Sequence, residues 1–205
     1  VAEEMLYANT LMPGKVLRAA IEAGAAVFVN LASGWQLIPE RRAKSPDYIS
    51  TKEAFRSLLT HQSSKIYGFS IFVNEIIVPG DTRKKLVNEA IRCGLTNQPL
   101  TVDYPNKILG ISSVDMLGEE VVNLLRNPQV RPREFLYQNF SDVTVGEIVG
   151  IVLDCVGGLK VISKSHETRV VPETVLPLFG ELPRGELPLL VQSIINHQVA
   201  GRNTA

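Results

Sequence analysis

Val27-Phe28-Val29-Asn30-Leu31 is a short apolar run of the kind that forms a strand buried on both faces of a sheet. A second run of this kind, Phe69-Ser70-Ile71-Phe72-Val73, follows further along the chain. Between them, Ser45-Pro46 is a good helix opening, because serine can act as the N-cap and proline suits the first helical position. A buried strand, a helix and a second buried strand predict a parallel sheet with crossover helices. The chain is therefore predicted to be an α/β protein.

Local signals around these strands indicate further elements. Residues 3–23 have apolar side chains at helical spacing, which predicts a helix. The polar, basic stretch 40–44 is interpreted as a loop. Asp115 is expected to cap a helix, and Thr144-Val145-Gly146-Glu147 fits a capping box that opens another.

The order of these elements predicts two domains. We expect residues 1–80 to form the later half of a Rossmann-type domain and residues 81–205 to form mainly a smaller substrate domain. Residues 107–127 are expected to return to the sheet of the first domain.

Composition excludes several classes of function. Lys and Arg together number 21, and Asp and Glu also number 21, so the chain lacks the basic excess of an extended nucleic-acid surface. No apolar run approaches the length of a membrane span, and no charged-then-apolar leader opens the chain. The two cysteines are interpreted as free thiols, and no histidine has metal-ligand spacing. We therefore expect a cytoplasmic protein without a metal, a membrane or a nucleic-acid partner.

Tyr48 and Lys52 stand four residues apart on the helix that opens at Ser45-Pro46. This spacing places both side chains on one helix face. An unperturbed phenol has a pKa of about 10 and is a poor base at neutral pH. An ammonium about 4 Å away contributes about 4 kcal/mol to the phenolate at an effective dielectric of about 20. The pair is therefore predicted to act as a general acid and base near neutral pH.

Ser33 strengthens this prediction because it stands where the first strand ends. Ligands of open parallel sheets gather at the carboxyl ends of strands, so the Ser33 hydroxyl could bind the substrate oxygen that Tyr48 deprotonates. The spacing of Tyr48 and Lys52 alone is weakly specific. An amphipathic helix with a buried tyrosine and a solvated lysine is the alternative interpretation.

Several stretches, taken in order, resemble the extended short-chain dehydrogenase/reductases, the NAD-dependent epimerase/dehydratase group that acts on nucleotide sugars. They are Tyr7-Ala8-Asn9-Thr10, Asn30-Leu31-Ala32-Ser33-Gly34-Trp35-Gln36, Tyr48-Ile49-Ser50-Thr51-Lys52-Glu53-Ala54-Phe55, Val78-Pro79-Gly80-Asp81 and Ser113-Val114-Asp115. The resemblance extends from about residue 3 to about residue 198.

This resemblance implies roles for individual residues. Tyr48 would be the catalytic acid and base, and Lys52 would assist it and contact the ribose of NAD or NADP. Ser33 would orient a sugar hydroxyl or keto oxygen, and Asn9 would hold a water in a proton relay. The implied reaction is hydride transfer between a nicotinamide and a sugar carbon. The helices that contain Asn9 and Tyr48 often form a dimer bundle in the family, which implies a homodimer.

The sequence also departs from the family pattern. The Gly-rich strand–turn–helix that seats the cofactor pyrophosphate is absent, and we expect it in a segment upstream of Val1. Lys107 stands where relatives often place an arginine for the nucleotide phosphates, and it would act as a point charge. Trp35 could stack on a nucleobase or sugar, and core packing is the alternative. Arg41 is interpreted as part of a solvated loop, with diphosphate binding as the alternative.

Two possible functions follow from the resemblance and from these departures. The first is an NAD(P)-dependent oxidoreductase or epimerase that acts on a nucleotide sugar. The second is a non-catalytic truncated remnant or interaction protein that binds no cofactor by itself and uses an exposed sheet edge to bind a partner.

Overall fold

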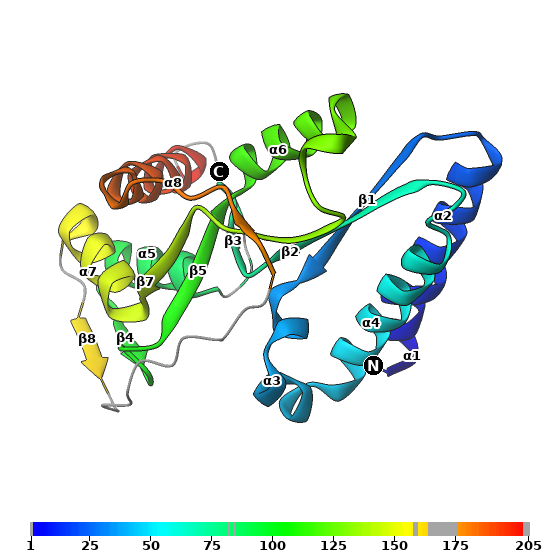
Figure 1. Cartoon of the computed structure of the whole chain (residues 1–205). Coiled ribbons are helices and arrows are strands. Elements are labelled where there is room, and N and C mark those ends of the chain that lie inside the picture. The colour runs from blue at the N-terminus through cyan, green and yellow to red at the C-terminus, as the bar shows by residue number, and fades with distance from the viewer. Residues whose placement is uncertain (1, 82, 84, 158–159, 164–175, 203–205) are drawn as a thin grey trace. The chain divides into compact units, whose positions relative to one another are not determined.

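The structure is a computed structural model that describes residues 2–81, 83, 85–157, 160–163 and 176–202 (Figure 1). The chain divides into two compact units. Unit 1 comprises Val1–Asn74, Met116–Tyr137 and Pro172–Phe179, and unit 2 comprises Glu75–Asp115, Gln138–Val171 and Gly180–Ala205. Each unit is described separately below.

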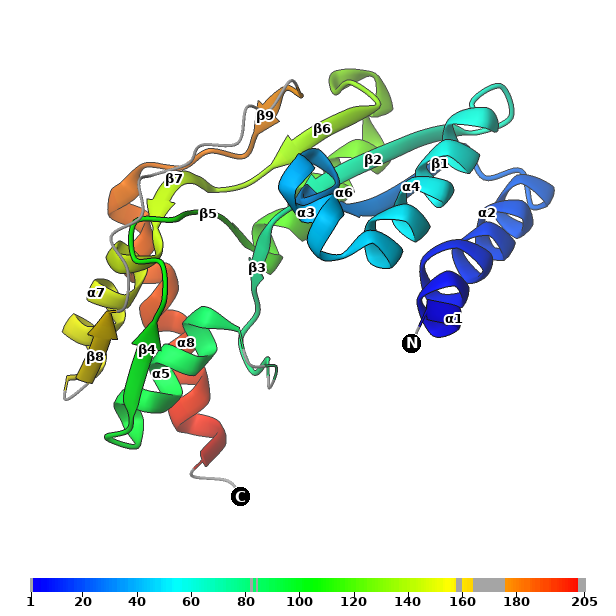
Figure 2. The same ribbon diagram turned by 90° about the horizontal axis from the view of Figure 1, so that it is seen from below.

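Unit 1 is built on a parallel sheet with the strand order β1-β2-β6-β9. Its strands are β1 (Val27–Ser33), β2 (Tyr67–Val73), β6 (Glu134–Tyr137) and β9 (Leu178–Phe179). Figure 2 shows the four strands side by side. The strands β1 and β2 pair along their full length, from Val27 opposite Tyr67 to Ser33 opposite Val73. The predicted α/β class, with parallel strands and crossover helices, is confirmed.

Helices cover both faces of this sheet (Figures 1 and 2). One face carries α4 (Pro46–His61) and the continuous helical segment α1 (Ala2–Leu6), η1 (Tyr7–Leu11) and α2 (Met12–Glu22). The other face carries α6 (Val114–Arg126), whose Leu117 and Leu124 are buried. The core under α2 and α4 consists of the buried side chains Leu17, Phe55, Leu59 and Ile66, against which Phe28 of β1 packs.

Of three local predictions in this part of the chain, two are wrong and one is confirmed. Residues 40–44, expected to be a loop, belong to α3 (Pro39–Lys44), because Pro39 stands at the start of a helix that continues to Lys44. The predicted opening of α4 is confirmed, because Ser45 is the N-cap residue and Pro46 is the first helical residue, although the Ser45 side chain makes no cap hydrogen bond. Asp115 lies inside the first turn of α6, one residue after its start, so it is not the N-cap.

Unit 2 has two small sheets. The strands β3 (Glu75–Ile77), β5 (Ile108–Ser113) and β7 (Phe140–Thr144) form one sheet, in which β5 pairs β3 in parallel and β7 antiparallel. The strands β4 (Pro99–Val102) and β8 (Lys160–Ser163) form a parallel pair. The helices are α5 (Leu86–Leu95), α7 (Val145–Val156) and α8 (Leu187–Arg202). Their apolar side chains share one core, which includes Ile91, Ile111, Ile148 and Ile194.

The predicted capping box at the start of α7 is confirmed. The Thr144 hydroxyl accepts a hydrogen bond from the Glu147 N–H at 3.2 Å, and the Thr144 N–H donates to the Glu147 carboxylate at 2.7 Å. The hydrogen bonds that the Thr144 N–H and the Thr144 hydroxyl donate to the Glu147 carboxylate, together with the charge of Arg184, lower the pKa of Glu147. The helix ends at Gly157, whose φ of 69° suits a residue without a Cβ atom. Within the described part of the chain, no helix is long and apolar enough to cross a membrane.

Candidate functional site

The candidate site lies in unit 1, where β1 ends. Ser33 is the last residue of β1, and the 3-10 turn η2 (Gly34–Leu37) follows it directly. The Ser33 hydroxyl accepts a hydrogen bond from the Trp35 N–H at 3.3 Å and so acts as the N-cap of this turn. A Cβ atom at position 34 would lie 1.9 Å from the side-chain oxygen of Asn74, so any larger residue there would force the Asn74 side chain to move. The Asn74 side chain, which follows β2, therefore lies directly against the Ser33 turn.

Helix α4 places Tyr48 and Lys52 beside this turn. The Lys52 ammonium lies 5.9 Å from the centre of the Tyr48 ring and donates a hydrogen bond of 3.3 Å to the Leu31 carbonyl oxygen. Tyr48 and Lys52 are both half-buried. Tyr48 and Lys52 therefore lie on one face of α4, as their spacing predicts. This face of the helix lies against the last residues of β1.

Trp35 completes this cluster. Its ring meets the Tyr48 ring edge-on, with 6.1 Å between the two centroids, and it is 38% exposed. The Arg41 guanidinium lies 4.6 Å above the Trp35 ring, so Arg41 stacks on the site instead of belonging to a solvated loop. Trp35 therefore presents an aromatic surface at the edge of the cluster, and it is not packed in the core.

Asn9 belongs to the π-helical turn η1, a rare geometry that often marks functional sites. Its side-chain amide donates to the Thr51 hydroxyl at 3.1 Å, and the Thr10 hydroxyl donates to the Thr51 carbonyl oxygen at 2.7 Å. The Thr51 hydroxyl also lies 3.0 Å from the Tyr48 carbonyl oxygen. Asn9 is thus joined, through Thr51, to the backbone of the turn that carries Tyr48.

Lys107 is placed in the other unit. It is an exposed residue just before β5, and its backbone N–H donates to the Tyr104 carbonyl oxygen at 3.2 Å. Unit 1 therefore brings Ser33, Trp35, Tyr48, Lys52 and Asn9 into one neighbourhood, whereas Lys107 belongs to unit 2.

A hydrogen-bonded chain behind the cluster was missed at the sequence level. The Ser33 N–H donates to Gln36, Gln36 donates to Glu53, and Arg56 bridges Glu53 and Glu134. The hydrogen bonds to Glu134, with the charges of Glu134 and Glu53, raise the pKa of Arg56 against the opposing effect of burial. The sequence does contain a signal for the contact of Ser33 with Gln36, because a serine followed three residues later by glutamine is a capping-box pattern.

Across the described ranges, no group of three or more His, Cys, Asp or Glu side chains is arranged to hold a metal ion. The chemistry of the cluster is that of a phenol, an ammonium and a hydroxyl.

Comparisons with known proteins relate this fold to solved structures. No protein-family model matches the chain, and no curated protein matches it. A GDP-L-fucose synthetase from Naegleria fowleri is 10% identical, with a TM-score of 0.74 over 100% of this chain and 74% of that one. A dTDP-glucose 4,6-dehydratase from Streptomyces venezuelae with NAD bound is 15% identical, with a TM-score of 0.71 over 98% of this chain and 69% of that one.

A third similar structure is MoeE5 in complex with UDP-glucose and NAD. It is 12% identical, with a TM-score of 0.70 over 94% of this chain and 71% of that chain. At these identities the similarity establishes the fold, which is the α/β fold of Rossmann-type enzymes.

Proposed function

We propose that this protein is an NAD(P)-dependent oxidoreductase or epimerase that acts on a nucleotide sugar. The observation that carries the proposal is the position of the Lys52 ammonium, which lies between the Tyr48 ring and the Leu31 carbonyl oxygen at the carboxyl end of β1. The structures of similar fold support it, because they include enzymes whose complexes contain NAD and UDP-glucose.

In this proposal Tyr48 is the acid and base. Its phenol removes a proton from a sugar hydroxyl, or returns one to a keto oxygen, while the nearby Lys52 ammonium stabilises the phenolate. Ser33 orients the same substrate oxygen. Asn9 holds a water that exchanges protons with the site. The nicotinamide, when bound, would accept or supply the hydride at the sugar carbon.

Lys52 also fits a role in holding the cofactor. Among the described residues, the Leu31 carbonyl oxygen is its one hydrogen-bond acceptor, and an ammonium has three donors. The remaining donors suit the hydroxyls of a ribose, and the Tyr48 hydroxyl would share that contact. The sequence has no Gly-rich turn for the pyrophosphate, so we assign only the nicotinamide end of the cofactor to these residues.

We further propose that the two units have different roles in the reaction. In this proposal unit 1 carries the acid and base residues, and unit 2 is the substrate domain. Trp35 would stack on the nucleobase or the sugar, because its ring is partly exposed beside Tyr48. Lys107 would contact a nucleotide phosphate.

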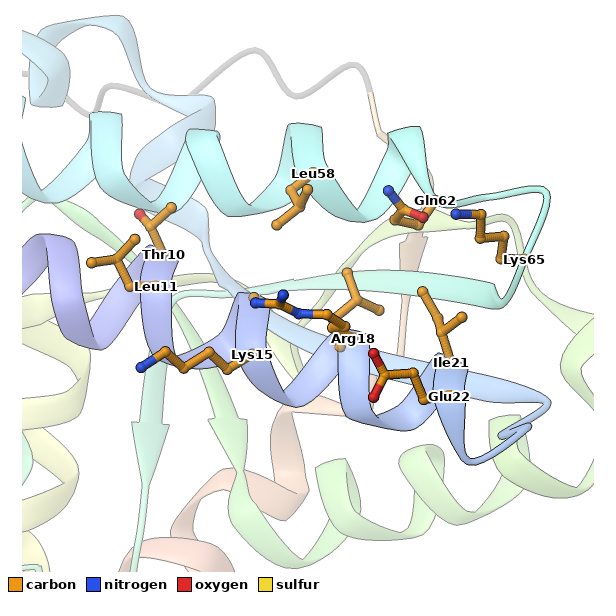
Figure 3. Close-up of a pocket in the computed structure, with 11 residues that line it drawn as sticks. Thr10, Leu11, Lys15, Arg18, Ile21, Glu22, Leu58, Gln62 and Lys65 are labelled. Carbon is orange, nitrogen blue, oxygen red and sulfur yellow. The ribbon is translucent and has the colours of Figure 1, made fainter.

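We also propose a homodimer through the helical segment α1–η1–α2. Five large apolar side chains are exposed on this segment: Leu6, Tyr7, Leu11, Met12 and Val16. Beside them, α2 and α4 enclose a groove of about 600 Å³, whose lining includes Leu11, Ile21 and Leu58 together with Lys15 and Arg18 (Figure 3). Exposed apolar patches of this kind mark interaction sites.

The charges on the segment favour a second copy as the occupant. Glu4 stands seven residues before Leu11, and Arg18 stands seven residues after it. Two antiparallel copies related by a two-fold axis at Leu11 would therefore place Glu4 of each beside Arg18 of the other.

Leu11→Glu is expected to convert this dimer to monomers. The substitution brings two carboxylates together at the axis, and like charges in an interface cost several kcal/mol, which raises the dimer Kd about a hundredfold. Light scattering during size-exclusion chromatography measures the mass. Leu125→Glu on α6 is the matched control, because Leu125 is 51% exposed and Leu11 is 49% exposed. An unchanged mass in Leu11→Glu would contradict this arrangement.

A second candidate function is that of a non-catalytic interaction protein, and the β1 edge favours it. In the described part of the chain, β1 pairs only with β2, and its seven residues contain no charge and no proline. The opposite edge, β9, has two residues and follows Pro177. Edges that are short or interrupted by proline resist pairing, whereas long uncharged edges accept another strand.

Cofactor titration separates the two functions. For the enzyme we expect NADH or NADPH to raise the thermal midpoint, because a ligand at 100 times its Kd stabilises the folded state by about 2.7 kcal/mol. We also expect turnover of UDP-, GDP- or dTDP-linked sugars, followed by nicotinamide absorbance. No thermal response and no turnover, together with a stable self-associated state by light scattering, would favour the interaction protein.

A further inference from the structure

A continuous hydrogen-bonded chain runs from the Ser33 backbone to the start of β6. The Ser33 N–H donates to the Gln36 side-chain oxygen at 2.9 Å, and the Gln36 side-chain N–H donates to Glu53 at 2.7 Å. Arg56 donates to the other Glu53 oxygen at 3.1 Å and to both oxygens of Glu134 at 2.7 and 2.6 Å. The chain therefore joins the end of β1, helix α4 and strand β6 within unit 1.

The hydrogen bonds of this chain determine which functional group can stand at position 36. Its side chain is 3% exposed, so both ends of the amide require partners inside the protein. The Ser33 N–H can only donate and the Glu53 carboxylate can only accept, which makes an amide the group that satisfies both. A carboxylate at position 36 would face the Glu53 carboxylate with no proton between them.

Glu53 connects this amide to the helix that carries the acid and base residues. It directly follows Lys52 on α4, and Arg56 anchors it one turn later. The bidentate ion pair of Arg56 with Glu134 then fixes the Arg56 guanidinium against β6. The part-buried hydrogen bond of Gln36 with Glu53 thereby links the Ser33 turn directly to α4, in addition to the Lys52–Leu31 and Trp35–Tyr48 contacts.

We infer that Gln36 and Glu53 are positioning residues that hold Ser33 at a fixed place relative to Tyr48 and Lys52, an inference that rests on the proposed function of those three residues. Neither side chain needs to touch substrate for this role. Small displacements of a catalytic group have large effects on rate, since about 1 Å of misplacement can cost about a hundredfold.

Exchanging the amide and the carboxylate tests this inference. Gln36→Glu alone opposes two carboxylates and should release the Ser33 turn. The double variant Gln36→Glu with Glu53→Gln restores all three contacts and reverses the direction of only one, the hydrogen bond between positions 36 and 53. In it, the new carboxylate accepts from Ser33 and from the new amide, and the new amide oxygen accepts from Arg56.

We expect hydrogen exchange of the Ser33 amide to become at least about tenfold faster in Gln36→Glu and to return to within about threefold of the wild-type rate in the double variant. In turnover assays with NAD(P)H and a nucleotide sugar, kcat should fall about tenfold to a hundredfold in the single variant, recover in the double, and change more than KM in both. Gln98→Glu, at an exposed position in unit 2, is the control for the substitution itself.

The two readouts keep this inference separate from the proposed function. If the wild-type chain shows no turnover, the proposed function fails, and the exchange of the Ser33 amide still decides whether Gln36 and Glu53 hold the turn. Wild-type exchange in Gln36→Glu, or a double variant no better than the single, overturns the inference. If Gln36→Glu alone does not fold, recovery of folding in the double variant supports the pairing, and continued failure overturns it.

Discussion

Tyr48→Phe is expected to lower kcat about 10²–10⁴-fold, the range that a positioned general acid or base contributes. The substitution removes only the phenol oxygen. The ring remains, and with it the edge-on contact with Trp35 and the position of Lys52 over the ring. Binding of the cofactor and of the nucleotide sugar should therefore change little, and the loss should appear in kcat more than in KM.

Steady-state turnover and cofactor titration measure the two effects separately. Tyr104→Phe is a matched control, because Tyr104 lies in unit 2 and is 46% exposed. Undiminished turnover in Tyr48→Phe would remove the proposed mechanism, since no other described phenol stands beside Ser33 and Lys52.

Phe135→Ala is expected to destabilise unit 1 by about 3–5 kcal/mol, the usual cost of truncating a buried phenylalanine. Phe135 lies on β6, is fully buried, and meets the Phe179 ring of β9 edge-on with 5.3 Å between centroids. Its removal leaves a cavity under β6 and deprives β9 of its aromatic contact. The lost stability is a large part of the total for a domain of ordinary stability.

Urea unfolding followed by the fluorescence of Trp35 measures this effect, because Trp35 is the one tryptophan of the chain and lies in unit 1. Leu125→Ala on α6 is the comparison at an exposed position, and it should change stability by no more than about 0.5 kcal/mol. A shift of less than about 1 kcal/mol for Phe135→Ala would mean that β6 does not contribute to the core as its burial indicates.

The sequence predicted the elements whose signals are local and strong. The apolar runs at 27–31 and 69–73 became the parallel strands β1 and β2, and the capping box at Thr144 starts α7. Errors occurred where the type of a residue favoured one position for a helix start and the helix began at another. Asp115 is a good cap by type, yet α6 begins at Val114, so Asp115 lies within the first turn.

Part of the candidate site could also be predicted from the sequence, without knowledge of the fold. Four-residue spacing was enough to place Tyr48 and Lys52 on one helix face, and a strand end was enough to place Ser33 near a ligand edge. Their roles in catalysis stay a prediction. Arg41 was misread because its partner, the Trp35 ring, is brought to it by the turn and by α3, and neither was evident from periodicity.

The sequence by itself determined the α/β class and the Tyr48–Lys52 pair, because both depend on spacings that a strand or helix repeats whatever surrounds it. Only the tertiary structure decided that Gln36, Glu53, Arg56 and Glu134 form one chain behind Ser33, since Glu134 is 78 residues from Arg56 along the sequence. Contacts of that separation depend on how strands order themselves in a sheet. The pairing of β2 with β6, which no local pattern encodes, is the physical reason that Arg56 and Glu134 meet.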